Sequence, residues 1–569
     1  MNLTNAGGGC NQIKDKFTNS PEGYSRSLHY FANLEGKKMM ESVIMMKGEK
    51  TMIRKPGFKR IFTCVLATLM LMVLVAGCGN STTPGTNEPQ TKPDNTAGTP
   101  TTPATQEKPA EIVFALLADN SPRTADAPLI EDAINEITLN KINTKVSLQL
   151  YPYSSYDQQI TLMQSGNEPL DLIFVTNANY SSYVSRNQLL QLDELIDKYG
   201  AGIREALGDY LDATAIDGKL YIVPTIRDLA KYYAVNMRKD LVDKYNIDTS
   251  AIKDIYDLTP ILKKVKEGEG ADFYPLVTAA AGRSILSYYV KYDPLGDAIG
   301  VLLNDGLDNT KVVLYEETEE YRELVKLVHD WYEAGYIMRD ITTTQEGYSS
   351  LLKAGKGFAY LNGAKAGYAE QATRNVGAPI LTIPLTPTIA NTASVTQVNW
   401  GISVTSKYPD AATKYLNLMY SDKDLVTLLC WGIEGKHYKI YEDGFAYYPE
   451  GVDGDSSGWT LNMGYAMGNQ FLSPLWRGEQ PNLWEQMKKD NDTALRSKAL
   501  GFTFNSENVK TELAAVNSVR SQYRMLIECG LADPDSGIIE EYVAKMKEAG
   551  VDKIIAEKQA QLDAWLAKK

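Results

Sequence analysis

The sequence predicts an α/β protein with two lobes and a helical C-terminal region, and three observations support this fold class. Short apolar runs alternate with helix-periodic segments from residue 111 onward, as in parallel sheets whose strands are joined by helices. About 460 residues follow the last low-complexity stretch, more than one hydrophobic core accommodates. From residue 506 to the C-terminus the pattern is helical.

The first lobe opens with three predicted strands and two predicted helices in alternation. The apolar runs at 111–119 and 171–177 are typical of buried strands, and 145–153 alternates as a strand does. The segments 127–143 and 155–168 have helical periodicity. Strands in this arrangement run parallel with right-handed crossovers, and ligands bind beyond their carboxyl ends.

Four polar residues follow two of these strands and are expected at a ligand-facing edge: Asp119, Asn120, Asn177 and Asn179. The second lobe begins after a turn and strand at 217–225, with a strand and then a helix at 232–248. Further elements are expected as two helices, at 318–335 and 348–355, and a strand, at 356–363.

The C-terminal region is predicted to form three helices. Apolar residues recur at helical spacing through 509–526 and give one buried face, and Gly530 ends that helix. Gly550 ends the next, and Trp565 on the last helix is expected to pack against the core. No fixed-period repeat is visible, which excludes solenoids and propellers.

The N-terminal part has the features of an export signal. Basic residues at 54–60 precede an apolar run at 61–77 that stops at Cys78. The ending Val-Ala-Gly-Cys at 75–78 resembles the lipobox of bacterial lipoproteins, which implies that Cys78 is diacylated and becomes the mature N-terminus. A single transmembrane helix is the alternative, because the run is about the minimum of the ~17–25 residues that a bilayer requires.

The segments on either side of this signal have different compositions. Residues 1–51 are irregular and polar, whereas a signal peptide begins with its basic region, so translation is expected to start at Met52. The signal peptide is then 52–77. Residues 78–109, rich in Thr, Pro, Gly and Asn, cannot bury enough apolar surface to fold and are expected to form a flexible tether.

Charge, cysteine and histidine usage exclude several function classes. A net charge of −13 argues against a nucleic-acid partner and against a basic membrane-binding face. Cys430 and Cys529 are the only cysteines after the tether, and two buried thiols are expected, although a disulfide is the alternative. Only His329 and His437 follow the tether, too few for a multi-histidine zinc site, and His329 is expected on a helix surface.

Several longer stretches carry a family resemblance. The lipobox, the tether, "YDQQITLMQSGNEPLDLIFV" at 156–175, "LLQLDELIDKYG" at 189–200, "DGKLYIVPT" and "RKDLVDKYNID" resemble family 1 extracellular solute-binding proteins of ABC importers. "WGIEGKHY" at 431–438 and the stretch 501–565 resemble the LipO-type lipoprotein branch of Gram-positive bacteria. The resemblance implies a type II-like periplasmic-binding-protein fold, a carbohydrate ligand, an ABC permease as partner, and no cofactor.

The expected organisation assigns every residue. The boundaries are 1–51 extension, 52–77 signal peptide, 78–109 tether, 110–226 and 385–440 first lobe, 227–384 second lobe, and 441–569 second-lobe completion with the C-terminal helical domain. Hinges are expected near 224–231 and 385–399, so that a solute contacting both lobes favours a closed form. A monomer is expected, held by its lipid on the outer face of the cell membrane.

A sugar site needs flat aromatic surfaces with planar polar groups at the ring edges. The candidates stand beside glycines or at predicted strand ends: Asn177, Arg227, Asn362, Asn399, Trp400, Trp431 and Glu434. Four of these residues have a structural alternative: core packing for the two tryptophans, a solvated loop for Arg227, and a turn-fixing role for Glu434.

Two other kinds of site are weighed against this prediction. The loop 453–458 begins like a calcium-binding loop, but Gly464 stands where the bidentate glutamate is needed, so no metal site is expected. A secreted glycosidase remains an alternative, because paired carboxylates need only be close in space. No G-x-S-x-G or H-E-x-x-H motif is present, and an oligopeptide-binding or sensor protein is the third possibility.

Overall fold

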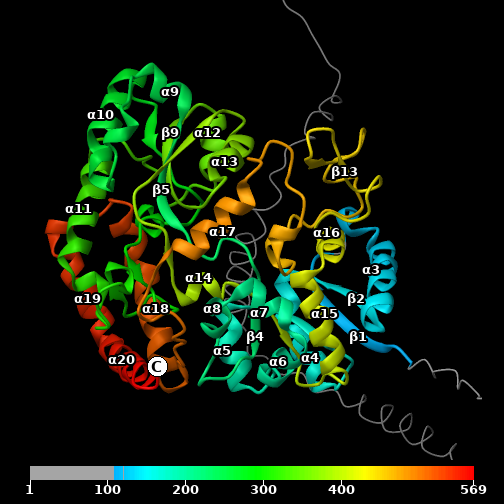
Figure 1. Cartoon of the computed structure of the whole chain (residues 1–569). Helices are drawn as coiled ribbons and strands as arrows, with labels where there is room; N and C mark the ends of the chain where they lie inside the picture. Colours follow the sequence, from blue (N-terminus) through cyan, green and yellow to red (C-terminus); the bar gives the residue numbers. More distant parts are fainter. Residues whose placement is uncertain (1–107, 120) are drawn as a thin grey trace, which may run out of the picture. The chain divides into compact units, whose positions relative to one another are not determined.

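The computed structural model describes residues 108–119 and 121–569 (Figure 1). The predictions about the start at Met52, the signal peptide, Cys78 and the tether lie outside the described residues, as does Asn120. Residues 106–569 form one compact unit.

The first sheet has five strands in the order β2-β1-β3-β12-β4. Their bounds are β1 Ala110–Leu117, β2 Thr144–Tyr151, β3 Leu172–Thr176, β4 Ile222–Pro224 and β12 Val398–Ile402. β1 pairs in parallel with β2 and β3, which confirms the predicted parallel arrangement there. β12 runs antiparallel to β3 and β4, because it returns to this sheet from the second lobe.

The second sheet has four strands in the order β10-β5-β9-β6. Their bounds are β5 Tyr232–Arg238, β6 Tyr274–Leu276, β9 Gly357–Ala364 and β10 Ile380–Pro384. β5 is antiparallel to both β9 and β10, whereas β6 and β9 are parallel. Two-residue strands complete the set: β7 Tyr292–Asp293, β8 Leu302–Leu303, β11 Ile389–Ala390, β13 Lys439–Ile440, β14 Ala446–Tyr447 and β15 Leu495–Arg496.

Helices surround both sheets (Figure 1). Those of the first lobe are α3 Ala127–Ile142, α4 Tyr156–Ser165, α5 Asn177–Ser185, α6 Asp193–Tyr199, α7 Ala201–Leu207, α8 Asp209–Asp212, α15 Pro409–Ser421 and α16 Lys423–Trp431. Those of the second lobe are α9 Lys239–Lys244, α10 Leu258–Glu269, α11 Glu319–Glu333, α12 Tyr348–Lys353 and α13 Tyr368–Val376. The remainder are α14 Thr392–Val395, α17 Leu483–Thr493, α18 Lys510–Glu528, α19 Ile538–Glu548 and α20 Val551–Leu566.

Helix α11 illustrates how the sequence specifies these elements. The Thr318 side chain caps its N-terminus by accepting a hydrogen bond from the Tyr321 N–H. Apolar side chains three or four positions apart form its buried stripe: Tyr321, Leu324, Val325, Val328 and Trp331. His329 lies half-buried beside this stripe, with Nδ1 2.9 Å from the Gly530 carbonyl oxygen, and so connects α11 to the end of α18.

The buried apolar residues form two large cores, one around each sheet. The second core includes residues of α18, α19 and α20, so the C-terminal helices complete the second lobe. The first core includes Trp459, Leu461, Met463 and Met467. The boundary predicted at residue 440 is therefore wrong, because the chain stays with the first lobe until the 3-10 turns that follow Met463.

Three crossovers connect the lobes, over 225–231, 385–397 and 468–494. They are joined to one another by backbone hydrogen bonds. Lys231 and Ile389 exchange two, at 3.1 and 2.9 Å, and the Ile226 N–H donates to Gly468 at 2.8 Å. The first two crossovers fall in the segments predicted as hinges.

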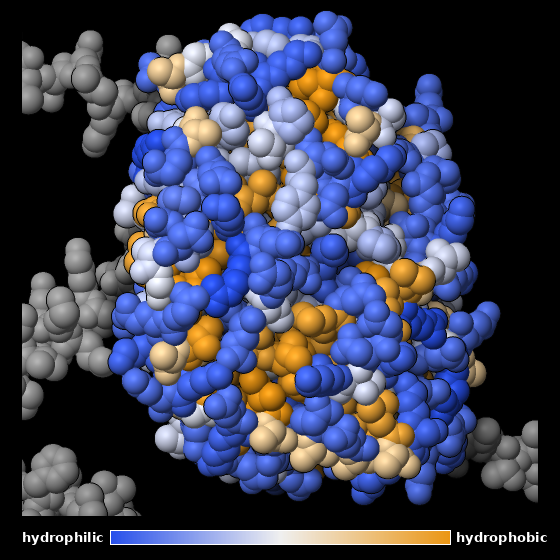
Figure 2. Space-filling model, turned by 90° about the vertical axis from the view of Figure 1, so that its left-hand side faces the viewer, coloured by the Kyte–Doolittle hydropathy of each residue, from blue (hydrophilic) through white to orange (hydrophobic). Residues whose placement is uncertain are grey.

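The face of the second lobe that carries α10, α11 and α19 is mostly hydrophilic, with apolar groups gathered in its lower half (Figure 2). Trp565 packs against Phe502 at a ring separation of 6.1 Å, as predicted. Among the described residues, we find no helix with the length and apolar character needed to cross a bilayer.

Candidate functional site

The parallel strands of the first sheet end at one edge, and polar or aromatic residues follow each end. Asn177 comes directly after β3, begins α5 and is exposed. Tyr153 follows β2 and is 62% exposed. Asn177 was predicted at this edge, whereas Tyr153 was not, because the alternation of 145–153 suggested that the strand continues through it.

The second sheet presents an edge of its own, where β5 begins and β9 and β10 end. Tyr233 pairs directly with Gly363, and the Lys231 Nζ lies 5.5 Å from the Tyr233 ring centre. Asn362 pairs with Ala234 and therefore faces the other side of the sheet. There its Nδ2 donates a hydrogen bond of 2.5 Å to the Tyr368 hydroxyl.

Arg227 lies buried at the centre of the first crossover. Its Nη2 donates to the Ser394 carbonyl at 2.9 Å and to the Gln397 Oε1 at 3.0 Å, both in the second crossover. Its Nη1 donates to the Asp228 carbonyl at 2.8 Å. Because Nε has no hydrogen-bond partner among the described residues, the guanidinium joins the two crossovers and keeps one donor unused.

The charges around Arg227 form a small network. Asp228 pairs with Arg227 at 3.2 Å and with Lys365 at 3.5 Å. Burial alone would raise the pKa of Asp228, but these two cations outweigh it and lower that pKa. Burial and the nearby Arg227 lower the pKa of Lys231.

A cavity of about 410 Å³ opens beside this edge. Its lining comes from β5, the loop after β9, the end of β10, the start of the second crossover and α17: Tyr232, Ala366, Pro384, Thr386, Pro387, Thr388, Gln486, Lys489 and Asp490. Its size is in the range of small-molecule sites, and its lining combines one aromatic ring with hydroxyl, amide and charged groups. The cavity is on the same side of the sheet as Asn362, since Tyr232 and Asn362 face the same way.

Asn399 and Trp400 lie in the core of the first lobe, with no exposed surface. The Trp400 indole N–H donates to the Ala466 carbonyl at 2.7 Å, and its rings pack against Phe114 and Phe174. The Asn399 amide donates to Val175 and Thr396 carbonyls, at 2.9 and 2.6 Å. The structure contradicts the prediction that these two residues contact a ligand, because neither reaches a surface. For Trp400, core packing was the stated alternative.

Trp431 and Glu434 lie on a different part of the first lobe. Trp431 is buried, donates its indole N–H to the Pro474 carbonyl at 3.2 Å and packs on Trp476. Glu434 is exposed, in a turn that His437 organises. The His437 Nδ1 accepts from the Ile433 N–H at 2.8 Å, and its Nε2 lies 3.1 Å from Asp126.

Local geometry describes the cysteines and the loop that begins like a calcium-binding loop. Cys430 and Cys529 are both free, so the disulfide alternative does not apply. The loop 453–458 is a self-capped turn, in which the Asp453 carboxylate accepts from the Asp455 and Ser456 N–H groups at 3.1 and 2.9 Å. No group of three or more His, Cys, Asp or Glu able to hold a metal occurs in 108–119 or 121–569.

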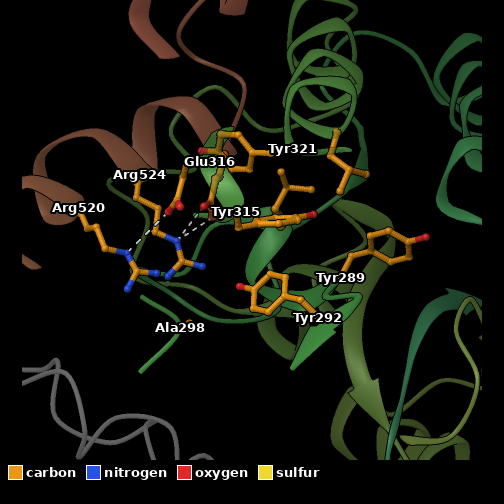
Figure 3. A pocket seen from close by; sticks show the side chains of 11 residues that line it. Tyr289, Tyr292, Ala298, Tyr315, Glu316, Tyr321, Arg520 and Arg524 are labelled. Atoms are coloured by element: carbon orange, nitrogen blue, oxygen red, sulfur yellow. Dashed lines mark hydrogen bonds and ion pairs between the residues drawn. The ribbon is translucent and has the colours of Figure 1, made fainter. Parts of the chain in front are cut away.

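A second enclosed cluster lies where α18 packs on the second lobe (Figure 3). Arg524 pairs with Glu528 at 2.9 Å, and Arg520 Nε lies 3.9 Å from Glu316, around a space of about 10 Å³ that tyrosines also line. Burial raises the pKa of Glu316. This space is about the size of one water molecule, so the cluster is a polar junction rather than a sugar site.

Comparison with known proteins identifies the class that this architecture represents. Residues 119–425, more than half of the chain, match the model of the bacterial extracellular solute-binding proteins. The chain belongs to this family. Residues 498–567 match a domain of unknown function (DUF3502), which covers the C-terminal helices.

Two relatives come from Streptococcus pneumoniae. A carbohydrate ABC transporter substrate-binding protein of serotype 4 (strain ATCC BAA-334 / TIGR4) is 29% identical over 439 residues, covering 76% of this chain and 87% of the relative. The crystal structure of the N-glycan transport solute-binding protein NgtS has a TM-score of 0.71 at 27% identity, covering 81% of this chain and 100% of that one.

Two further structures of NgtS, in complex with Man1GlcNAc and with Man5GlcNAc, have TM-scores of 0.63 and 0.61 at the same 27% identity. They cover 80% and 81% of this chain and 100% and 99% of theirs. The present structure is therefore more similar to the NgtS structure described without a glycan.

Proposed function

We propose that this chain is the substrate-binding protein of an ABC importer, which captures an oligosaccharide between its two lobes and delivers it to a permease. The observation that carries the proposal is the arrangement of exposed tyrosine and planar polar groups at the edges of both sheets, beside crossovers that can act as hinges. The names of the two relatives from Streptococcus pneumoniae support the carbohydrate class.

The side chains at these edges suit sugar chemistry. A sugar ring offers apolar C–H faces to an aromatic ring and hydroxyl groups to amides and charges. Tyr153 and Tyr232 supply rings, and Asn177, Asn362 and Lys231 supply polar groups. No covalent step is required, so we assign the chain a binding role without catalysis.

We assign Arg227 a positioning role at the hinge, because both of its terminal nitrogens are used within the crossovers. Closure around this hinge is part of the proposal. The TM-score is 0.71 against the NgtS structure described without a glycan and 0.61 against the one in complex with Man5GlcNAc, at the same 27% identity. A ligand that contacts both lobes shifts the population toward the closed form.

A thermal-shift and calorimetric titration of residues 106–569, which form a compact unit, tests the proposal. The probes are Man1GlcNAc, Man5GlcNAc and a panel of other oligosaccharides and peptides. A ligand at 100 times its Kd stabilises the folded state by ~2.7 kcal/mol, so the transition temperature should rise by several degrees. A response to peptides alone would contradict the carbohydrate class, and release of reducing ends would contradict the binding role.

We also propose that the protein is held on the outer face of the membrane by a lipid on Cys78, in a Gram-positive cell. The lipobox at 75–78 supports this proposal. Metabolic labelling with radioactive palmitate should label the wild-type protein but not the Cys78→Ala variant, which should stay unlabelled and unprocessed at this site. Equal labelling of both would contradict the anchor.

A further inference from the structure

A cluster of aromatic side chains on the first lobe is partly exposed, and packing within the fold does not account for the exposed part. We name Trp431, Tyr447, Tyr448 and Trp476 the aromatic platform. The Trp476 ring lies 4.3 Å from Trp431, 5.3 Å from Tyr448 and 5.9 Å from Tyr447. Trp431 is buried, whereas Tyr447 is 43% exposed.

The platform is attached to the carboxyl edge of the first sheet. The loop that follows β1 contains Arg123, which pairs with Asp455 and whose carbonyl accepts from the Thr460 N–H at 2.8 Å. The next residues of this loop hold the same segment, since the Asp126 N–H donates to Gly458 at 2.9 Å. These bonds hold the segment that follows the β13–β14 hairpin against the loop after β1.

The platform also borders the second lobe. Arg477, directly after Trp476, pairs with Asp443 of the hairpin at 2.8 Å. Two residues later Glu479 pairs with Arg374 of α13, and the Gln480 side chain donates to Glu370 of α13 at 2.6 Å. In Figure 1 this orange segment runs from near β13 to α13 before entering α17. The platform therefore lies where the two lobes meet.

A small hydrophobic core would account for part of this cluster. Trp431, Tyr438 and Ala446 are buried together and hold the hairpin on α16. Such a core needs neither the exposed ring of Tyr447 nor a polar rim. Arg477 and Asp443 supply that rim, and the Arg477 guanidinium also lies 3.9 Å from the Tyr441 ring centre. Exposed rings with charged and hydroxyl groups at their edges match the faces and edges of sugars.

We propose that the aromatic platform is a distal subsite, which binds the outer sugar units of an oligosaccharide whose inner units occupy the site between the lobes. This inference rests on the proposed function. Only longer oligosaccharides would reach the platform, because it lies at the lobe boundary, outside the sheet edges that would hold a short ligand.

The test compares a short and a long ligand in calorimetric titrations. Man1GlcNAc and Man5GlcNAc are titrated into wild-type residues 106–569 and into the variants Tyr447→Ala and Tyr447→Phe. We expect Tyr447→Ala to weaken binding of Man5GlcNAc about ten-fold and of Man1GlcNAc less than about two-fold, because one stacking contact is lost only with the longer ligand. Tyr447→Phe keeps the ring and should retain most of the affinity.

The matched control is Tyr408→Ala. Tyr408 is 46% exposed, similar to Tyr447, and follows the C-terminal end of β12, at the edge of the first sheet opposite to the one that carries Asn177. The control variant should change neither affinity, and unchanged melting temperatures show that all variants fold. Equal loss for both glycans, or no loss for either, overturns the distal subsite and leaves the proposed function intact. Failure of the wild-type protein to bind either glycan contradicts the proposed function and this inference together.

Discussion

At the scale of single residues, one buried amide determines the path of the first crossover. The Asn491 Oδ1, on α17, accepts from the Leu229 N–H at 2.9 Å and the Ala230 N–H at 3.3 Å. Its Nδ2 donates to the Arg227 carbonyl at 2.7 Å. These three backbone groups are enclosed. Without the amide, the Ala230 N–H would be left unpaired, and the Leu229 N–H and the Arg227 carbonyl would keep only the 3.0 Å hydrogen bond between them.

The variant Asn491→Ala should therefore lower the free energy of unfolding by about 2–3 kcal/mol, the cost of leaving buried backbone groups unpaired. Urea denaturation followed by tryptophan fluorescence measures this change. Lys488→Ala on the same helix is the control, since its exposed ion pair with Asp492 contributes about 0.3–0.5 kcal/mol. Equal, small effects in both variants would contradict the anchoring role.

A buried carboxyl group near the hinge makes stability depend on pH. Asp305 is 8% exposed, and burial together with the neighbouring Asp293 raises its pKa to about 7. Because the pKa of Asp305 is higher in the folded than in the unfolded state, protonation of this group contributes to stability. The contribution is complete below the unfolded pKa of 3.8 and is lost as the pH rises through the folded pKa of about 7. This group thus favours the folded state in mildly acidic solution.

We expect Asp305→Asn to remove roughly 2–3 kcal/mol of the stability difference between pH 5 and pH 8, and to stabilise the protein at pH 8. Asparagine tolerates the positive φ of 53° at this position. Unfolding curves at several pH values measure the effect. Asp308→Asn, an exposed neighbour, should leave the pH dependence unchanged, and an unchanged dependence in Asp305→Asn would show that Asp305 is not its source.

At the scale of elements, a buried lysine fixes the last helix to the second lobe. The Lys558 Nζ lies 2.6 Å from Asp297, 2.7 Å from the Ile299 carbonyl and 3.2 Å from the Gly300 carbonyl. All three ammonium donors are thereby used, although burial lowers the pKa of this lysine. The contact holds α20 against the loop 297–300, far in sequence from that helix.

Replacing this lysine by the similarly long methionine, Lys558→Met, leaves Asp297 and two carbonyl groups without their partner. We expect a loss of about 3 kcal/mol in the free energy of unfolding. Thermal and urea unfolding measure it. Lys553→Met, one turn earlier and 60% exposed, should cost much less, because its ion pair with Glu512 is at the surface. Similar losses would mean that helix propensity, not the buried charge, is responsible.

The order and type of the elements could be predicted from sequence because their patterns are local. The periodic stretch 127–143 became Ala127–Ile142, and Gly530 follows α18 as expected. The direction of β12 could not be predicted, since it depends on a return from the second lobe. The return of 459–467 to the first core was also missed, because Trp459 packs against residues distant in sequence.

The candidate site was less predictable, since exposure is a property of tertiary structure. Trp400 and Trp431 stand beside glycines, as expected of a ring that stacks on a sugar, yet both are buried. Asn177 and Asn362 were placed at strand ends because strand ends are visible in sequence. Tyr153 and Tyr447 were missed, and the signal that could have found Tyr153 was the proline that precedes it and ends β2.

At the scale of the whole molecule, the chain passes between the two lobes in three crossovers that are hydrogen-bonded to one another. Arg227 joins the first two crossovers, and the Ile226 N–H joins the first to the third. A rotation about these segments would move each core as a rigid body, because packed interiors resist deformation. A small change at the crossovers would then bring the two sheet edges toward each other.

Small-angle X-ray scattering should detect this movement. We expect the radius of gyration of residues 106–569 to fall when a bound oligosaccharide is present at saturation, because only a ligand with higher affinity for the closed form can shift the population. The double variant Tyr232→Ala/Asn362→Ala, which lacks two proposed contacts on the second lobe, should bind weakly and keep the larger radius. If calorimetry shows tight binding to the wild-type protein without any change in radius, the lobes do not close, and capture must occur within a site that is already formed.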